Sequence, residues 1–264
     1  MATCRSFDGT QIVYESLGSG RPALVLVHGW CCNRRYWAAQ LEVLSDHALV
    51  VTVDLAGHGD SDASRQDWSI AAFGADVCSV IDELALDDVV LVGHSMGADV
   101  TLEASRRLVG RVRGMVWVDQ FGQLDRFADE RQVCDRMLAF RGDFPRAADA
   151  FVRRLFPPSA DPSLVDRVAH TIGSAPEEVA LASLEATWNH GRAVPALLDE
   201  VQLPVVAING PDTHTDAASL RSHGVDVIVM PDVGHFPMVE RPREFNSCLL
   251  QALARLDVKS GRVA

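Results

Sequence analysis

Positive charge is scarce in this sequence, and that scarcity excludes two kinds of partner. The chain of 264 residues has 24 lysines and arginines against 36 aspartates and glutamates, so its formal net charge is −12. Such an excess of negative charge repels the phosphates of nucleic acids and the headgroups of anionic membranes. We therefore expect no nucleic-acid partner and no membrane partner, and the oligomeric state is left open.

The cysteines are few and show no pattern of metal ligands. None of the six stands in a C-x-x-C pair or in a Cys/His cluster with the spacing of a zinc site, and Cys31 and Cys32 are adjacent. Adjacent cysteines suit neither a disulfide framework nor a metal site. We expect free thiols, no bound metal and a location in the reducing cytoplasm.

Long hydrophobic runs are missing as well. No segment approaches the roughly 18 consecutive apolar residues of a membrane-spanning helix, and residues 1–20 contain no apolar run of the kind found in signal peptides. Hydrophobic residues still make up 48% of the chain, which is enough for a substantial core. One large domain, or a domain with an insertion, is the expected organisation.

Short apolar runs alternate with amphipathic stretches over most of the chain. A run at 11–15 is typical of an early antiparallel strand. Further strands are expected at 23–27, 48–53, 88–92, 114–118, 205–209 and 225–230, and helices at 37–44, 70–84, 98–109 and 242–256. This alternation predicts an α/β fold, with a mostly parallel sheet covered by helices on both faces.

Residues 121–201 interrupt the alternation. They contain no clear strand, and helical composition recurs at 126–141, 145–155, 163–171 and 176–190. We predict a helical cap, inserted into an α/β core formed by residues 1–120 and 202–264. A cap in that position would cover the carboxyl ends of the strands, where open α/β sheets bind their ligands.

Residues 93–97 read Gly-His-Ser-Met-Gly and lie between an expected strand and an expected helix. In that context G-x-S-x-G forms a nucleophile elbow, a sharp turn that projects its central hydroxyl above the sheet. The flanking Gly93 and Gly97 are needed because the strand and the helix leave no room for a Cβ. The pattern predicts that Ser95 is an activated nucleophile rather than a serine that merely begins a helix.

A serine hydroxyl needs a base to accept its proton. The best candidate is His235, which follows the expected strand 225–230 and comes last in the order of serine, acid and histidine. We expect His94, inside the elbow, to point away from this base. His190 is expected to be a surface or capping residue.

The acid partner of that histidine has more than one candidate. Asp119 ends the apolar strand 114–118, where an unpaired carboxylate would be costly, so a partner such as a histidine ring is expected. Asp216 and Asp212, which follow the strand 205–209, are the alternatives. Asp216 could instead cap a helix that begins at Ala217. We favour Asp119.

A tetrahedral intermediate with a negative oxygen needs preorganised hydrogen-bond donors. One is the backbone N–H of Met96, directly after the serine. The second is expected from the loop after strand 23–27, where the N–H of Trp30 is the natural donor. The Trp30 indole would then form part of a pocket wall, or simply pack beneath the cap.

Taken together, these segments resemble the α/β-hydrolase superfamily. The resemblance is carried by residues 28–30 (His-Gly-Trp), 54–61 (Asp-Leu-Ala-Gly-His-Gly-Asp-Ser), 93–97 and 234–236 (Gly-His-Phe), and it covers about residues 10 to 256. It implies an eight-stranded, mostly parallel sheet and a Ser/Asp/His triad. The family usually places the acid where Thr213 stands here, and an acid at Asp119 resembles a minority of its members.

The resemblance implies hydrolysis of a carboxylic ester, lactone or thioester of a small molecule through Ser95, His235 and Asp119, without a cofactor. Aromatic residues of the cap, Trp188 among them, are expected to shape a pocket for a medium-sized apolar or aromatic group, although Trp188 could also lie on a surface helix. Two alternatives stay open. One is a cofactor-independent dioxygenase of N-heteroaromatic compounds that uses a His/Asp dyad, and the other is a hydrolase-like ligand sensor.

Overall fold

A single sheet of eight strands organises the molecule. The computed structural model describes residues 1–211 and 215–260, the last four of these by their backbone only. The strands are β1 (Ala2–Arg5), β2 (Gln11–Leu17), β3 (Ala23–Val27), β4 (Val50–Asp54), β5 (Val89–His94), β6 (Val112–Val118), β7 (Val205–Asn209) and β8 (Val225–Val229). Their order is β1-β2-β4-β3-β5-β6-β7-β8, and only the pairs β1–β2 and β2–β4 are antiparallel. The predicted eight-stranded, mostly parallel sheet is confirmed.

The parallel strands form where the sequence is continuously apolar. Every residue of β3, β4 and β5 is buried, as expected for strands covered on both faces. Strand β1 was not predicted, because a strand of four residues with one buried side chain shows no clear hydrophobic pattern.

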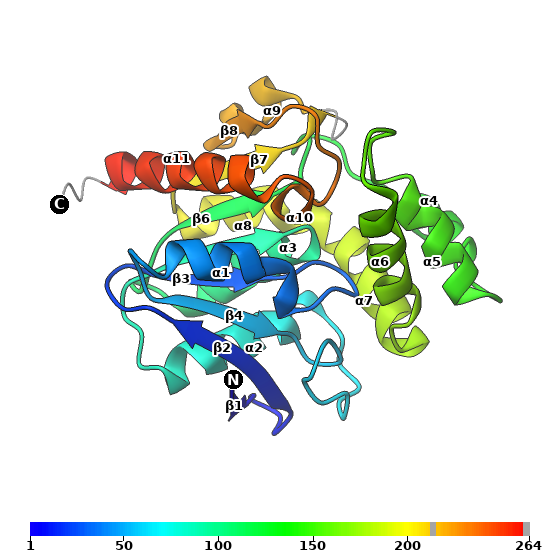
Figure 1. Cartoon of the computed structure of the whole chain (residues 1–264), viewed down its shortest axis with the longest axis horizontal. Coiled ribbons are helices and arrows are strands. Elements are labelled where there is room, and N and C mark those ends of the chain that lie inside the picture. The colour runs from blue at the N-terminus through cyan, green and yellow to red at the C-terminus, as the bar shows by residue number, and fades with distance from the viewer. Residues whose placement is uncertain (212–214, 261–264) are drawn as a thin grey trace.

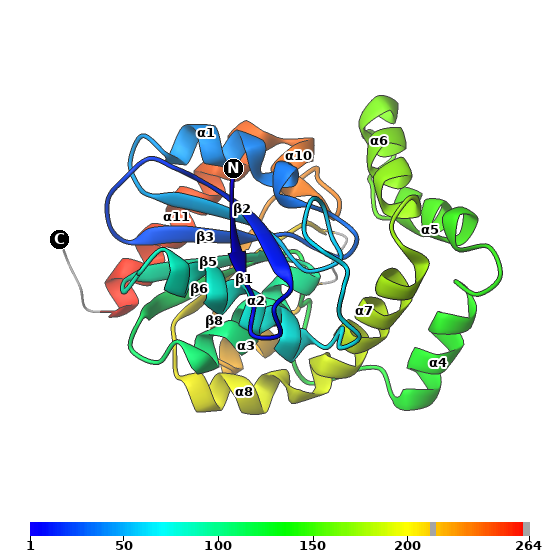
Figure 2. The same ribbon diagram turned by 90° about the horizontal axis from the view of Figure 1, so that it is seen from below.

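Helices cover both faces of the sheet (Figures 1 and 2). On one face lie α1 (Ala38–Leu44) and α11 (Pro242–Ser260), and on the other lie α2 (Ile70–Glu83), α3 (Met96–Arg107) and α8 (Val194–Val201). Short helices complete the core: η1 (Arg34–Trp37), η2 (Gly191–Ala193), α9 (Ala217–Ser222) and α10 (Pro237–Glu240). Among the described helices, none combines the length and the low polarity that crossing a membrane requires.

Four helices lie beside the carboxyl ends of the parallel strands and are here called the inserted helices. They are α4 (Glu130–Leu138), α5 (Phe144–Arg153), α6 (Pro162–Gly173) and α7 (Glu177–His190), and Figure 1 shows them in green to yellow-green at one end of the sheet. Three of them begin with an aspartate cap, and two of these caps are followed by proline in the first turn. The next helix, α8, packs against α3 instead. The division of the chain into core and cap at residue 201 stays a prediction.

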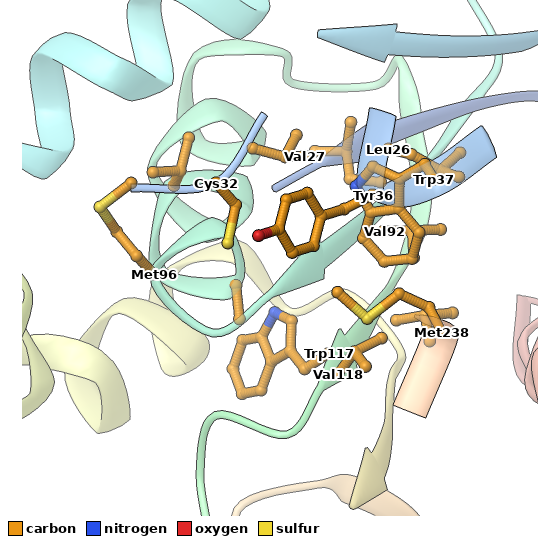
Figure 3. Close-up of a cluster of buried hydrophobic side chains, with 14 of the residues drawn as sticks. Leu26, Val27, Cys32, Tyr36, Trp37, Val92, Met96, Trp117, Val118 and Met238 are labelled. Carbon is orange, nitrogen blue, oxygen red and sulfur yellow. The ribbon is translucent and has the colours of Figure 1, made fainter. Parts of the chain in front are cut away.

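Large side chains fill the space beneath this end of the sheet. Figure 3 shows Trp37 of η1 beside Val92 of β5, the Tyr36 hydroxyl directed toward the sulfur of Cys32, and Trp117 of β6 pointing to the side away from Trp37. Trp37 and Trp117 are at most 1% exposed. Close packing of this kind resists small displacements, so the strand ends above it are held in fixed positions.

A cluster of buried charges fastens α7 to α3. His190 Nδ1 lies 2.7 Å from Asp99 Oδ1, and His190 Nε2 lies 3.1 Å from Glu103 Oε1. The prediction that His190 is a surface or capping residue was wrong, since its side chain is only 10% exposed and makes no capping hydrogen bond. Burial alone would lower the pKa of His190, but the two carboxylates raise it to about 9. A charged imidazolium therefore bridges the inserted helices and the core.

This cluster predicts a specific pH dependence of stability. In the folded protein, the pKa of His190 lies above its ordinary value of 6.5. The contribution of the charged ring to the free energy of unfolding is therefore complete below about pH 6.5 and is lost as the pH rises through about 9. A shift of that size corresponds to on the order of 3 kcal/mol. We expect the difference in free energy of unfolding between the wild type and His190→Gln to shrink between about pH 6.5 and pH 9.5 in urea titrations. His47→Gln, which changes an exposed histidine, is the control, and a difference that does not vary with pH would contradict the assignment.

Candidate active site

Ser95 stands in a strained turn between β5 and α3. Its backbone has φ 49° and ψ −127°, a conformation that a residue with a side chain adopts at a cost of about 1–3 kcal/mol. The flanking glycines leave the required space: a Cβ on Gly93 would lie 2.2 Å from the Gly97 carbonyl oxygen, and a Cβ on Gly97 would lie 2.4 Å from the Val27 carbonyl oxygen. The backbone therefore has the geometry predicted for a nucleophile elbow.

His235 and Asp119 are joined by a short hydrogen bond. The distance from His235 Nδ1 to Asp119 Oδ2 is 2.7 Å, and the Asp119 side chain is 6% exposed. The other carboxylate oxygen of Asp119 accepts the N–H of Gly210 at 2.7 Å. Because a carboxylate accepts this bond, the ring carries its proton on Nδ1, and Nε2 is left as the acceptor.

The strand order places this pair next to the serine. Asp119 directly follows β6, which is the neighbour of β5 in the sheet. The N–H of Ser95 donates to the carbonyl of Val118 at 2.9 Å, so the elbow is bonded to the residue before Asp119. Asp119 itself has φ 51°, a turn that directs the chain away from the sheet immediately after the strand.

The loop that carries His235 is held by three residues on different elements. A carboxylate of Glu240, on α10, accepts the N–H groups of Gly234 and Phe236 at 2.9 and 2.8 Å. The carbonyl of Leu155 accepts the N–H of His235 at 2.8 Å. The backbone of this loop is therefore fixed on both sides of the imidazole. No sequence signal distinguished Glu240 from an ordinary surface acid.

His94 is the third support of that loop, and the prediction that it points away from the base was wrong. The ring centroids of His94 and His235 are 4.9 Å apart, and His94 Nε2 lies 2.7 Å from the carbonyl oxygen of His235. A carbonyl only accepts, so Nε2 of His94 carries the proton. Burial, with a further contribution from His235, lowers the pKa of His94 to about 3, which keeps its ring neutral.

The structure separates the candidate acids. The Asp216 carboxylate accepts the N–H groups of Ala218 and Ser219, both at 3.0 Å, and so caps α9. The capping interpretation of Asp216 is confirmed. Asp212 lies outside the described residues, as does Thr213. Of the candidate acids in the described part of the chain, Asp119 is the one bonded to His235.

The loop after β3 lies directly over the elbow. A Cβ on Gly29 would be 3.1 Å from the Ser95 Cβ and 2.6 Å from His94 Nδ1, so this approach requires glycine. The Trp30 indole donates to the carbonyl of Ala180 on α7 at 2.7 Å, and Cys31 has a positive φ of 53°. The backbone of Trp30 is thereby set close to the serine.

Two buried polar groups hold this loop from below. His28 Nε2 accepts the N–H of Leu55 at 3.1 Å, and burial lowers the pKa of His28 to about 4, so the ring is neutral. Arg34 forms an ion pair with the fully buried Asp54, whose Oδ1 also accepts the Arg34 N–H at 2.6 Å. The segments 28–30 and 54–61, which the sequence singled out, thus form one support.

Ser95 and His235 line a common cavity of about 310 Å³. Its wall also contains Trp30 and Trp188, both expected there from the sequence, together with Gln120 and Arg136, which the sequence analysis did not single out. The remaining lining residues are Cys32, His94, Phe151, Leu155, Ile172, Leu184, Thr187 and Phe236. The cavity therefore combines a mostly apolar wall with a few polar groups.

Within the described residues, the Ser95 hydroxyl makes no hydrogen bond that meets standard geometry. The same part of the chain has no group of three or more His, Cys, Asp or Glu side chains placed to hold a metal ion. All six cysteines are free thiols. The groups available for chemistry at this site are the hydroxyl, the imidazole with its carboxylate, and the backbone N–H groups of the elbow and of the loop after β3.

The chain resembles known proteins over most of its length. Residues 24–247 match the model of a family described as the alpha/beta hydrolase family. Among curated proteins, the non-heme chloroperoxidase CPO-A1 of Kitasatospora aureofaciens is 35% identical over 118 residues, which are 44% of this chain and 42% of that protein. The match therefore spans less than half of that relative.

Two solved structures share nearly the whole fold. An esterase from Thermogutta terrifontis has 24% identity and a TM-score of 0.83, with 97% of this chain and 98% of that chain covered. Est816, described as an N-acyl homoserine lactone degrading enzyme, has 25% identity and a TM-score of 0.81, with coverage of 95% and 99%. The family match includes the elbow, the loop after β3 and the His235 loop, and with this sheet topology it shows that the chain belongs to the alpha/beta hydrolase family.

Proposed function

We propose that this protein hydrolyses the carboxylic ester bond of a small molecule, in an open-chain ester, a lactone or a thioester, through an acyl-enzyme on Ser95. The observation that carries the proposal is the 2.7 Å hydrogen bond between His235 and Asp119, at a cavity that the strained Ser95 also lines. Nearly the same fold in Est816, which degrades a lactone, is consistent with this bond type.

In the proposed reaction, the Ser95 hydroxyl attacks the acyl carbon and His235 Nε2 accepts its proton. The imidazolium then returns the proton to the leaving alcohol, and Asp119 stabilises its charge and keeps the ring in the required tautomer. Water, activated by the same imidazole, releases the acid from the acyl-enzyme. The hydrogen bond from the Ser95 hydroxyl to Nε2 would form as substrate binds, since catalytic hydrogen bonds often tighten only in that complex.

The negative oxygen of the intermediate would be bound by two backbone N–H groups. Met96 is the first residue of α3, and the first N–H groups of a helix have no partner within it. Trp30 supplies the second N–H from the loop that approaches Ser95. Each such donor contributes about 3–4 kcal/mol to the transition state, so the backbone geometry around Gly29 matters as much as the side chains.

The cavity supports a substrate with a medium-sized apolar or aromatic group. Trp30 contacts the rings of Phe140, Phe144 and Phe151 at centroid distances of 5.8 to 6.2 Å, and Phe151 and Trp188 reach the cavity surface. Aromatic rings packed edge to face form a rigid wall that recognises flat or apolar groups.

One observation also favours a second candidate. The His235–Asp119 bond is formed while the serine hydroxyl is unbonded, which is the arrangement needed by a His/Asp dyad that deprotonates an N-heteroaromatic substrate before its reaction with oxygen. Oxygen consumption on addition of such a substrate, retained in Ser95→Ala and lost in His235→Ala, would favour this dioxygenase over the hydrolase. A ligand sensor would instead show slow turnover with tight retention of the product.

The covalent step predicts a label on Ser95. We expect a fluorophosphonate to add to the peptide that contains residue 95, as read by mass spectrometry, because the hydroxyl is activated by His235. Ser95→Ala should show no adduct and a loss of ester hydrolysis of at least about a thousandfold. The exposed Ser247 provides a matched control in Ser247→Ala. An active, folded wild type that takes no label would exclude the acyl-enzyme.

The acid assignment predicts unequal effects of two aspartate substitutions. Asp119→Asn should lower kcat on a chromogenic short-chain ester by about 10⁴-fold, since an amide in that place favours the wrong imidazole tautomer. Asp216→Asn retains a helix-capping side chain and should change kcat by less than about threefold. Circular dichroism would verify that both variants are folded. Loss of activity only in Asp216→Asn would overturn the assignment.

A further inference from the structure

We propose that the substrate carries an anionic carboxylate, and that Arg136 at the mouth of the cavity binds it. The inference rests on the proposed function and narrows its substrate class. Arg136 lies on α4, one of the inserted helices, and lines the same cavity as Ser95 and His235. It would act as a residue that determines specificity and would leave the chemical steps to the triad.

Among the described residues, the lining of the cavity has charge of one sign only. Of the fourteen lining residues in that part of the chain, Arg136 is the one with a permanent charge, and none is an aspartate or a glutamate. Burial keeps the neighbouring His94 neutral by lowering its pKa. Gln120 and Thr187 are the polar but uncharged members of the wall. A cation beside an apolar wall, with no acid to neutralise it, complements an apolar substrate that ends in a negative charge.

Arg136 also has no acid partner among the described residues, and its helix explains why. The residues three and four positions away are Gln132 and Val133 on α4, and Ala139 and Phe140 just after it, and none of them is acidic. Arg153 on α5 shows the contrast, because it forms ion pairs with Asp149, one turn before it, and with Asp166 on α6. The donors of Arg136 are therefore available to a ligand.

An aromatic ring holds the guanidinium of Arg136 at the cavity. Its central carbon lies 5.6 Å from the centroid of a Trp188 ring, in the geometry of a cation–π contact. Trp188 itself packs against Phe140 at a centroid distance of 6.3 Å. A cation–π contact uses none of the guanidinium N–H groups as hydrogen-bond donors to a polar atom, and these N–H groups have the paired geometry that a carboxylate accepts.

The test compares two 4-nitrophenyl esters by the release of 4-nitrophenol: the monoester of glutaric acid, and its methyl ester, in which a methyl group removes the negative charge of the free carboxylate. We expect the wild type to have the higher kcat/KM on the charged ester. Arg136→Gln should lower that value about five- to thirtyfold and leave the neutral ester within about twofold, an effect of the size measured for single charge-assisted contacts. The carboxylate lies away from the reacting bond, so the change should appear in KM rather than in kcat.

Three further measurements make the result specific. Arg136→Lys should restore part of the preference, since it keeps the charge without the planar fork. Arg131→Gln, which changes an exposed arginine of the same helix that does not line the cavity, should leave both esters unaffected. The preference of the wild type for the charged ester should also weaken as sodium chloride is raised to about 0.5 M.

Two outcomes would overturn the inference: equal kcat/KM values of the wild type on the two esters, or an equal loss on both esters in Arg136→Gln. If the proposed function is wrong, the result is distinguishable from these two outcomes, because neither ester is then hydrolysed in a reaction that requires Ser95. In that case, binding of monomethyl glutarate and of dimethyl glutarate is measured by calorimetry, and the comparison tests the inference. Binding of the monoanion that is lost in Arg136→Gln supports it, and equal binding of the two compounds, or none, refutes it.

Discussion

The candidate site depends on one hydrogen bond, between the carboxylate of Asp119 and the imidazole of His235. It joins the end of β6 to a loop more than a hundred residues later in the chain. The bond also sets the tautomer of the ring, and so determines which nitrogen is free to accept a proton. The backbone of the loop that carries His235 is held by hydrogen bonds to Glu240, Leu155 and His94. The bond to His94 also joins this loop to the elbow.

The second constraint is the absence of side-chain atoms where three segments meet. Gly29, Gly93 and Gly97 come from the loop after β3 and from the two sides of the elbow, and a Cβ on any of them would lie within 2.6 Å of a neighbouring atom. This close approach is what allows a backbone N–H of the β3 loop to lie near Ser95. The strain in the serine backbone is sustained by the strand and the helix that are packed on either side of it.

The inserted helices form part of the wall of the cavity at this end of the sheet. Their attachment to the core includes buried polar contacts, with the Trp30 indole bonded to Ala180 and the His190 imidazolium placed between Asp99 and Glu103. The same helices supply the aromatic wall and Arg136. The core therefore carries Ser95, Asp119 and His235, and the insertion supplies much of the apolar wall around Ser95 and His235.

The class of fold, the elbow at Ser95, the choice of His235 and the preference for Asp119 could all be predicted from local patterns: apolar runs, glycines that need space, and an acid at the end of a buried strand. Features that depend on contacts between distant segments became visible only in the folded chain. The fold assigned Asp216 to the cap of α9 and placed His94 against His235. It buried His190 between two carboxylates and brought Gln120 and Arg136 to the cavity. A lone histidine or arginine has the same local sequence whether it faces solvent or a partner on another helix, so only the packing of those helices separates the two cases.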